Sequence, residues 1–406
     1  MSDHIPFEIQ MEIMKRFPVK SLIQFRSVSK AWKSLIDSSH FIKLYTGRQQ
    51  HLLLRYDLQY KLEEPEYVSI VDDHTFPGHK VSPTVPVQLN ILENSRIIGN
   101  SHGLLCLYGY YYGWDGRVHT AVLWNISIRK AVDVVVPNVA YGKYATGLGF
   151  GVCGKTSDPK IVKVTYVDSW KDIETIPDSI PWQVEVFTVS TGAWRRPYSS
   201  NLPRKSITFH YDQVVVDGVL YWIVSDRITT DGGFRSLNLI ISFDITSEEF
   251  REINLPDALA HLKPYKLSIS KLKESLVVVQ SCGEINDRVF RVWMMKDGVP
   301  KSFTKIFTIC TPGATMISVP GFRKSGEPII QILDDFRHPH EDSSLVLYEP
   351  YSKHISNIGI SEWLCSFSLY NYMETLLLHD QPDLTTIDFP YFPADDIESG
   401  EEELNF

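Results

Sequence analysis

Near its start the chain carries a stretch, residues 5–36, that reads IPFEIQMEIMKRFPVKSLIQFRSVSKAWKSLI. Within it Ile9, Ile13 and Phe17 recur at every fourth position, which places them on one face of a helix. A proline flanks this series on each side: Pro6 and Pro18. Proline is tolerated in the first turn of a helix, and a helix normally ends before a proline. The spacing therefore predicts a helix between Pro6 and Pro18.

Two further short helices are expected in the same stretch. One carries the apolar residues Leu22, Phe25 and Val28. The other follows Ser29, which is a suitable N-cap, and carries Trp32, Leu35 and Ile36. Three helices of this size cannot bury much apolar surface alone. Either they cap the rest of the chain, or their apolar faces dock another protein.

This stretch resembles the F-box motif of plant F-box proteins along its whole length. It departs from the family pattern at Ile5, Met14 and Phe17, where Leu is usual, and at Ser29, where Cys is usual. The first three remain apolar and of similar bulk. The resemblance implies a domain at residues 1–45 that binds a Skp-type adaptor. By motif position, the adaptor-binding residues are Ile5, Pro6, Ile9, Ile13, Phe17, Leu22, Val28, Trp32 and Ile36. Some of these must instead hold the helices together, and the sequence does not sort them.

From residue 51 onward the pattern changes to short runs rich in Val, Ile and aromatic residues, separated by turn clusters. Such runs are typical of strands. The chain holds 20 Tyr, 20 Phe and 9 Trp, and aromatic side chains suit a pleated surface. The strands predicted in this way are 104–108, 121–125, 131–136, 161–167, 183–189, 213–216, 220–224, 239–245, 276–280, 289–295, 329–333, 344–348 and 374–378.

A short unit recurs in this region: an aromatic, a polar and an apolar residue, then Ser or Thr, followed by a turn. It begins at Trp124, Phe187 and Phe243, with a decayed copy at Tyr348 and a further aromatic residue, Trp293, in the gap before it. A period of about 50–60 residues with several strands per repeat is typical of propeller blades.

Hairpin sets give five blades: 96–137, 145–197, 207–256, 265–308 and 315–358. Strands remain at both ends, in 52–71 and 365–379, and their pairing would make a sixth blade and close the ring. Closure removes exposed strand edges, so we expect six blades over residues 51–393, with seven as the alternative.

The same region resembles the F-box-associated, kelch-like domain found behind plant F-boxes. The matching segments are 100–106, 123–125, 149–151, 186–194, 217–222, 243–244, 253–256 and 292–295. The two resemblances together cover about 5–380. The expected fold class is therefore α+β multidomain: a small three-helix F-box followed by an all-β kelch-like β-propeller.

Charge is distributed unevenly along the chain. The net charge is -9 overall, but residues 1–50 carry eight Lys or Arg and four acids, a net of +4. Residues 394–406 hold six acids and no base, which predicts a solvated, disordered acidic tail. A pI near 5.8 argues against a protein that coats nucleic acid. Five widely spaced cysteines, no signal peptide and no long apolar run predict an intracellular protein of the cytoplasm or nucleus, with no membrane partner.

Three segments match motifs of enzymes or metal sites. Residues 149–156 fit a phosphate-binding loop and residues 99–103 fit a nucleophile elbow, but each motif requires a helix directly afterwards, and a strand is predicted there instead. Residues 334–342 group two His with four acids, and a polar loop explains them better than a metal site. We therefore expect no catalytic, cofactor-binding or metal-binding residue.

The F-box resemblance implies a substrate receptor of an SCF (Skp–cullin–F-box) ubiquitin ligase, which binds the adaptor through its helices and a target protein through the propeller. Two alternatives remain at this point: a kelch-like interaction scaffold without a ligase, and a propeller enzyme. Residues 110–114, four aromatics around a glycine, form the most suggestive target loop. An ordinary aromatic strand end is the simpler interpretation, so the target-binding residues stay unknown.

Overall fold

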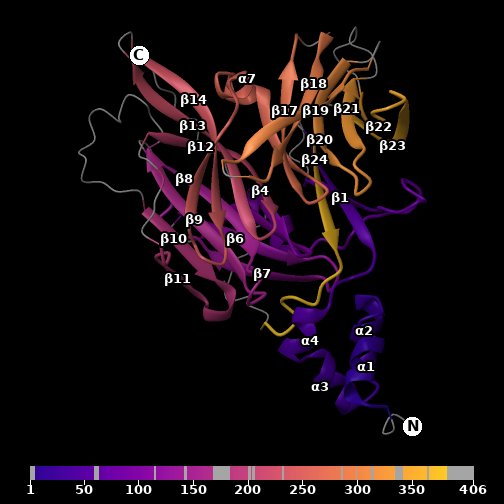
Figure 1. Ribbon diagram of the computed structural model, residues 1–406. Helices are drawn as coiled ribbons and strands as arrows, with labels where there is room; N and C mark the ends of the chain where they lie inside the picture. Colours follow the sequence, from indigo (N-terminus) through magenta and orange to yellow (C-terminus); the bar gives the residue numbers. More distant parts are fainter. Residues whose placement is uncertain are drawn as a thin grey trace, which may run out of the picture.

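The computed structural model describes residues 5–58, 64–113, 116–140, 144–167, 183–199, 203, 206–230, 233–284, 287–298, 300–311, 315–333, 342–363 and 365–381. They form a helical head, residues 5–45, below a ring of six four-stranded sheets (Figure 1). The predicted fold class and the preferred blade number are thus confirmed.

Four helices make up the head: α1 Phe7–Met14, α2 Val19–Phe25, α3 Lys30–Ile36 and α4 Ser39–Leu44. Pro6 and Pro18 are the N-cap residues of α1 and α2. The Ser29 hydroxyl accepts a hydrogen bond from the Trp32 N–H at 3.1 Å, as its position before α3 predicted. The fourth helix was not predicted, because its six residues are too few for a helical period to be recognised.

Each sheet of the ring is one blade. The closing blade holds β1 Gln50–Leu58, β2 Glu66–Val71, β3 Lys80–Val81 and β24 Cys365–Met373. The second holds β4 Glu93–Ser101, β5 Leu104–Gly113, β6 Gly116–Asn125 and β7 Lys130–Val135. The third holds β8 Tyr144–Val152, β9 Pro159–Val167, β10 Gln183–Thr188 and β11 Ala193–Arg195.

The fourth blade holds β12 Ile207–Val216, β13 Val219–Thr230, β14 Gly233–Asp244 and β15 Phe250–Asn254. The fifth holds β16 Leu267–Leu272, β17 Ser275–Cys282, β18 Val289–Lys296 and β19 Ser302–Ile309. The sixth holds β20 Thr315–Phe322, β21 Pro328–Leu333, β22 Asp342–Tyr348 and β23 Ile355–Trp363. Short helices α5 Val87–Asn90 and α7 Asp257–Ala260 lie between blades.

The ring closes by pairing its two ends. β24 runs antiparallel to β1 in an unbroken register from Gln50↔Met373 to Leu58↔Cys365. The predicted pairing of the terminal strands is therefore confirmed. The prediction of a strand at 374–378 was wrong, because β24 ends at Met373 and the chain then turns between the ring and the head.

The repeated sequence unit marks the end of the third strand of a blade, where the chain turns into the outer strand. The Asn125 carboxamide oxygen accepts the Ser127 N–H at 2.9 Å, and Asp244 accepts the Thr246 N–H at 2.8 Å in the same way. The polar residue of the unit therefore builds the turn. Trp293 lies in the third strand of its own blade, but short of the strand's end.

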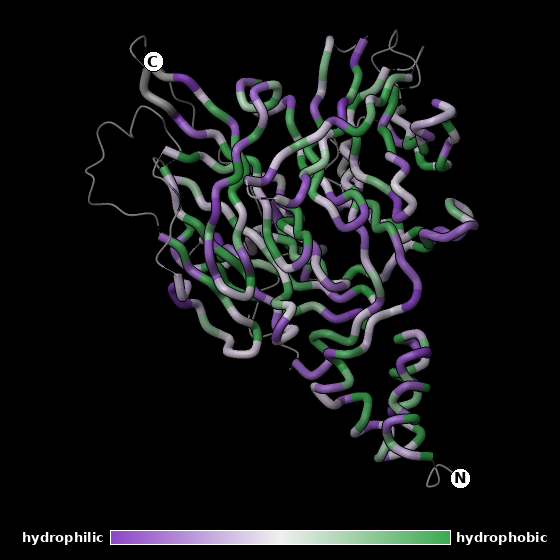
Figure 2. The backbone as a smooth tube through the Cα atoms, in the orientation of Figure 1, coloured by the Kyte–Doolittle hydropathy of each residue, from purple (hydrophilic) through white to green (hydrophobic). Residues whose placement is uncertain are grey.

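Apolar side chains fill the spaces between blades. Along the strands, hydrophobic residues are interspersed with hydrophilic ones (Figure 2). One cluster joins the third and fourth blades through Val162, Val186, Trp222 and Ile241, all at most 2% exposed. Each blade thus buries its two faces on its neighbours, and the ring depends on all six.

Inner strands run toward the head, and hairpin tips point away from it. β24 ends beside the head, whereas the tips of β13–β14, β17–β18 and β21–β22 lie on the opposite side of the ring (Figure 1). We call that opposite side the far face. The connections between blades reach the same side, since the strand direction alternates within each four-stranded sheet.

Stability should fall on mild acidification, because burial lowers the pKa of five histidines: His51, His102, His119, His210 and His379. Near and just below pH 6.5 the unfolded chain binds protons that the folded chain does not, so protonation favours unfolding there. We expect the melting temperature to fall between about pH 7 and pH 5.5. The His210→Gln variant should flatten this slope, and the same change at the exposed His354 should not. A melting temperature that is constant over this range would contradict the prediction.

Candidate functional site

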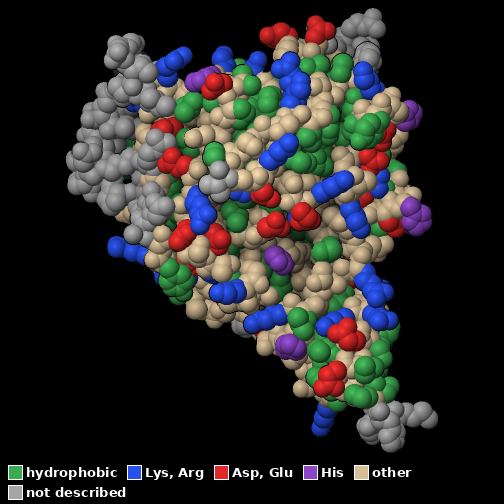
Figure 3. Space-filling view, in the orientation of Figure 1, with side chains coloured by type: hydrophobic (Ala, Val, Ile, Leu, Met, Phe, Trp, Pro, Cys, Tyr) green, Lys and Arg blue, Asp and Glu red, His purple; other side chains and the backbone are tan. Residues whose placement is uncertain are grey.

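Helix α1 turns most of its apolar side chains to solvent. Of its eight residues only Met14 is buried, while Phe7 is 56% exposed and Ile9 50% exposed. Ile13 and Phe17 continue the same exposed series. In Figure 3 hydrophobic side chains gather on the side of the head where α1 lies. A contiguous apolar patch of this kind on a small domain marks an interaction surface.

The opposite side of the head packs on the propeller. Met14, Leu22, Ile36 and Phe41 share one apolar cluster with residues of the second and third blades and with the segment 376–378 that follows β24. This contact explains why the head folds despite its size, because the propeller supplies the partner for its inner face.

The nine residues named from the motif differ in their exposure to solvent. Six are exposed: Ile5, Pro6, Ile9, Ile13, Phe17 and Val28. Leu22 and Ile36 are fully buried in the core of the head. Trp32 is half-buried and lies edge to face with Phe25, whose ring centroid is 5.5 Å away. Leu22 and Ile36 therefore hold the helices together, and the exposed six remain available to a partner.

Two exposed apolar residues of the head were missed by the sequence reasoning: Phe7 and Leu44. Phe7 is the first residue of α1 and stands outside the every-fourth-residue series, and Leu44 ends the unpredicted α4. The head also carries exposed basic residues, among them Arg16, Lys20 and Lys30. They account for the positive charge of this part of the chain.

Glu374, directly after β24, joins the propeller to the head. Its carboxylate accepts the N–H of Val19, the first residue of α2, at 3.1 Å and lies 3.5 Å from the Tyr45 hydroxyl. A carboxylate at the start of a helix satisfies one of its unpaired N–H groups. Burial and the charge of Glu374 together raise the pKa of Tyr45.

A second polar link lies at the other end of the same contact. Asp37 accepts two hydrogen bonds from the Arg26 guanidinium, at 2.6 and 2.9 Å, and lies 3.1 Å from His379 Nε2. Burial alone would raise the pKa of Asp37, but these bonds from Arg26 and His379 hold it below its ordinary value. With Glu374, this link fixes the orientation of the exposed patch relative to the ring.

Family comparisons match both parts of the chain. The F-box domain matches residues 2–44, and the F-box associated beta propeller domain matches residues 85–331, which is more than half of the chain. The chain belongs to the F-box proteins with an associated β-propeller.

Relatives of this F-box protein are found in Arabidopsis thaliana. The F-box protein CPR1 is 26% identical over 412 residues, which covers 95% of this chain and 91% of CPR1. The putative F-box protein At3g10430 is 28% identical and covers 62% of each chain. Among solved structures, the β-propeller domain of the trilobed protease from Pyrococcus furiosus aligns with a TM-score of 0.36 at 12% identity, over 66% of this chain and 71% of that one.

The enzyme-like motifs of this F-box protein lie in strands and turns. Residues 149–156 form the end of β8 and a turn that leads into β9, so no helix follows the glycines. Residues 99–103 form the hairpin between β4 and β5, and the buried Ser101 hydroxyl accepts the Val152 N–H at 3.1 Å. The loop at 334–341 lies outside the described residues. In the part of the chain that the structure describes, no helix is long and apolar enough to span a membrane.

Proposed function

We propose that this F-box protein is the substrate-recognition subunit of an SCF ubiquitin ligase. The observation that carries the proposal is the exposed apolar face of α1 on a head that is fixed to the propeller by Glu374 and Asp37. A Skp-type adaptor covers this face and, through the cullin, links the receptor to the rest of the ligase. Ile5, Pro6, Ile9, Ile13, Phe17 and Val28 supply the contacts, with Phe7 and Leu44 beside them.

The target protein binds the far face of the propeller. Exposed aromatic side chains occur in the connections on that side, among them Tyr112 and Tyr265. Tyr is favoured at interfaces because its ring is large and rigid and its hydroxyl is polar. Of the aromatic loop singled out in the sequence, Tyr110 and Tyr111 are buried, Tyr112 is exposed, and Trp114 lies outside the described residues.

This F-box protein contributes no chemical group to the reaction. It holds the target near the conjugating enzyme, so an encounter between two molecules becomes effectively intramolecular. The fixed head makes this proximity reproducible, since the distance between the adaptor and the target then depends on a rigid body rather than on a flexible linker.

Co-expression with a Skp-type adaptor tests the proposal. A stable complex that elutes as one species in size-exclusion chromatography, and that ubiquitinates a bound protein when cullin and conjugating enzyme are added, is the expected result. Candidate targets come from affinity purification with degradation blocked. A full-length, folded chain that forms no adaptor complex would contradict the ligase assignment and favour the scaffold alternative.

A further inference from the structure

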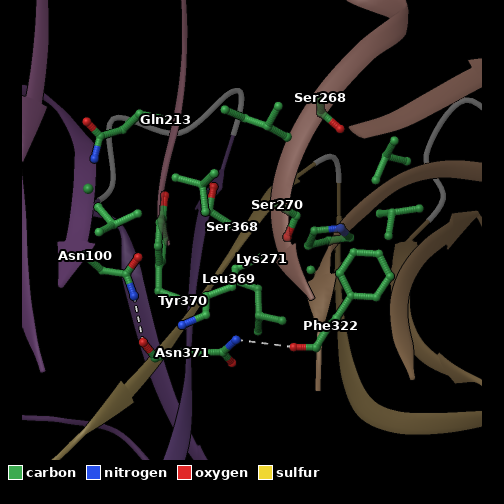
Figure 4. Close-up of a pocket in the computed structure, with 18 of the residues that line it drawn as sticks. Asn100, Gln213, Ser268, Ser270, Lys271, Phe322, Ser368, Leu369, Tyr370 and Asn371 are labelled. Carbon is green, nitrogen blue, oxygen red and sulfur yellow. Dashed lines mark hydrogen bonds between the residues drawn. The ribbon is translucent and has the colours of Figure 1, made fainter. Parts of the chain in front are cut away.

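The centre of the ring encloses a cavity of about 1430 Å³. Its wall is built by the inner strands β4, β12, β16, β20 and β24, whose side chains converge there from different blades (Figure 4). The wall is rich in polar groups, because inner strands turn their unpaired edges to the centre. A cavity of this size accommodates a small-molecule ligand.

Amide side chains tie most of these edges together. Asn100 donates to the Asn371 carbonyl at 2.6 Å, and Asn371 donates to the Phe322 carbonyl at 3.5 Å (Figure 4). Gln213 accepts the Phe150 N–H at 3.0 Å and donates to the Phe150 carbonyl at 3.1 Å. These bonds connect β4 with β24, β24 with β20, and β12 with β8. These amide groups hold neighbouring blades together.

On the wall formed by β16, several polar side chains are not used in bonds between blades. The hydroxyl groups of Ser268 and Ser270 form no side-chain hydrogen bond with a described residue, although both line the cavity. Lys271, next in β16, has a single described partner, Glu274, at 2.7 Å and can donate two further hydrogen bonds. Arg288 at the other end of this wall donates to the Ile317 carbonyl at 3.0 Å, and its buried Nε has no described partner. Lys271 and Arg288 thus keep unused hydrogen-bond donors on this wall, and the two serine hydroxyls can donate or accept.

Charge around the cavity has the opposite sign to that of the chain. The described lining contains six cationic residues, Lys266, Lys271, Lys273, Arg288, Arg323 and Lys324. It contains three acidic residues, Asp217, Glu274 and Glu284. The chain as a whole carries -9. Arg323 is held by Asp72 at 2.8 Å, yet the remaining cations still outnumber the acids. A concave site with an excess of one charge concentrates ions of the other.

The positive potential reaches across the cavity. His102 lies in the β4–β5 turn, on the second blade, and burial followed by the charge of Lys271 on the fifth blade lowers its pKa. The fifth and second blades therefore face one electrostatic environment, which any ligand at the centre of the ring would share.

We propose that the central cavity binds a small polyanion, a molecule with two or more phosphate or carboxylate groups, on the wall formed by Ser268, Ser270 and Lys271. Charge-assisted hydrogen bonds from the Lys271 ammonium hold the anionic groups, and the serine hydroxyls orient them. Arg288, at the other end of the wall, adds to the positive potential of the cavity. This site is separate from the adaptor-binding patch on the head and goes beyond the proposed receptor function.

The test uses the full-length protein with pyrophosphate and citrate as the added compounds, and sodium chloride at matched ionic strength as the reference. A ligand that binds only the folded state raises the melting temperature in proportion to its occupancy. If only pyrophosphate raises the melting temperature, the site binds phosphate groups. If only citrate raises it, the site binds carboxylate groups. If both raise it, the site selects negative charge. A melting temperature that follows sodium chloride for both compounds overturns the proposal.

Two variants locate the site. Lys271→Gln should weaken binding by at least about tenfold, because it removes a charged donor. Lys305→Gln makes the same change on the exposed outer strand of the same blade and should bind as the unchanged protein does. Equal affinities of the two variants would overturn the assignment.

If Lys271→Gln does not fold, a second variant tests the same wall. Ser270→Asp places a negative charge there and should abolish the rise in melting temperature. Adaptor binding by these variants should be unchanged, so this site and the receptor function fail independently.

Discussion

Replacing Ile9 and Ile13 together by alanine is expected to weaken the binding of a Skp-type adaptor by at least about 100-fold. Both side chains lie on the exposed face of α1, at 50% and 43% exposure, and neither belongs to the core of the head. A buried aliphatic anchor at an interface contributes about 2 kcal/mol or more, and two of them act here. Titration calorimetry with purified adaptor measures the loss.

The design separates lost contacts from a lost fold. Alanine favours a helix more than isoleucine does, so the double variant should leave α1 at least as stable as before. Leu22 and Ile36 are left intact, because truncating fully buried side chains would destabilise the head. The matched control replaces Val87 and Ile91, two exposed apolar residues at the same spacing at α5, and should bind the adaptor normally. Binding by the Ile9/Ile13 variant at the level of this control would refute the role of the α1 face.

The head and the ring were predictable because both carry strong local signals. A helical period between two prolines defines α1, and the turn chemistry of Asn125 in the second blade recurs at Asp244 in the fourth. The closing blade followed from the requirement that terminal strands be paired. The helix and the turns were predictable from spacing and turn residues alone, whereas the closing blade joins strands from the two ends of the ring's sequence.

Two of the inner strands, β4 and β16, were missed for a physical reason. They line a polar cavity, so β4 reads ENSRIIGNS and β16 reads LSISKL, without a long apolar alternation. Register also shifts within β4, β12 and β20, and a bulge breaks the period of two on which recognition depends. Only the last four residues of β12 were predicted, and these follow its bulge.

The adaptor-binding residues could not be sorted from the sequence, because the helical period shows that a face is apolar but not what covers it. Leu22 and Ile36 are buried beside the segment 376–378, which lies more than 300 residues away in the chain. The same segment was predicted to be a strand, because its apolar residues resemble one. Contacts between the two ends of the chain thus decide which apolar residues of the head stay free.

The fourth blade is joined to the third by a buried carboxylate. Glu248, in the turn after β14, is fully buried and lies 2.8 Å from Lys160 Nζ. It also accepts two hydrogen bonds from the Arg195 guanidinium, at 2.5 and 2.7 Å, and the Tyr198 N–H at 3.1 Å. Burial alone would raise the pKa of Glu248, but the hydrogen bonds from Arg195 and Lys160 hold it below its ordinary value.

Glu248→Ala is therefore expected to lower the free energy of unfolding by about 3–5 kcal/mol, because it leaves the buried Lys160 ammonium without its counter-charge. Chemical denaturation followed by tryptophan fluorescence measures the loss. Glu249→Ala removes the neighbouring carboxylate, whose partner Arg251 is 74% exposed, and should cost less than about 1 kcal/mol. Similar losses in the two variants would mean that the blades are held by their apolar faces alone. A large loss confined to Glu248 would show that a ring closed at its ends also depends on a polar contact between two of its blades.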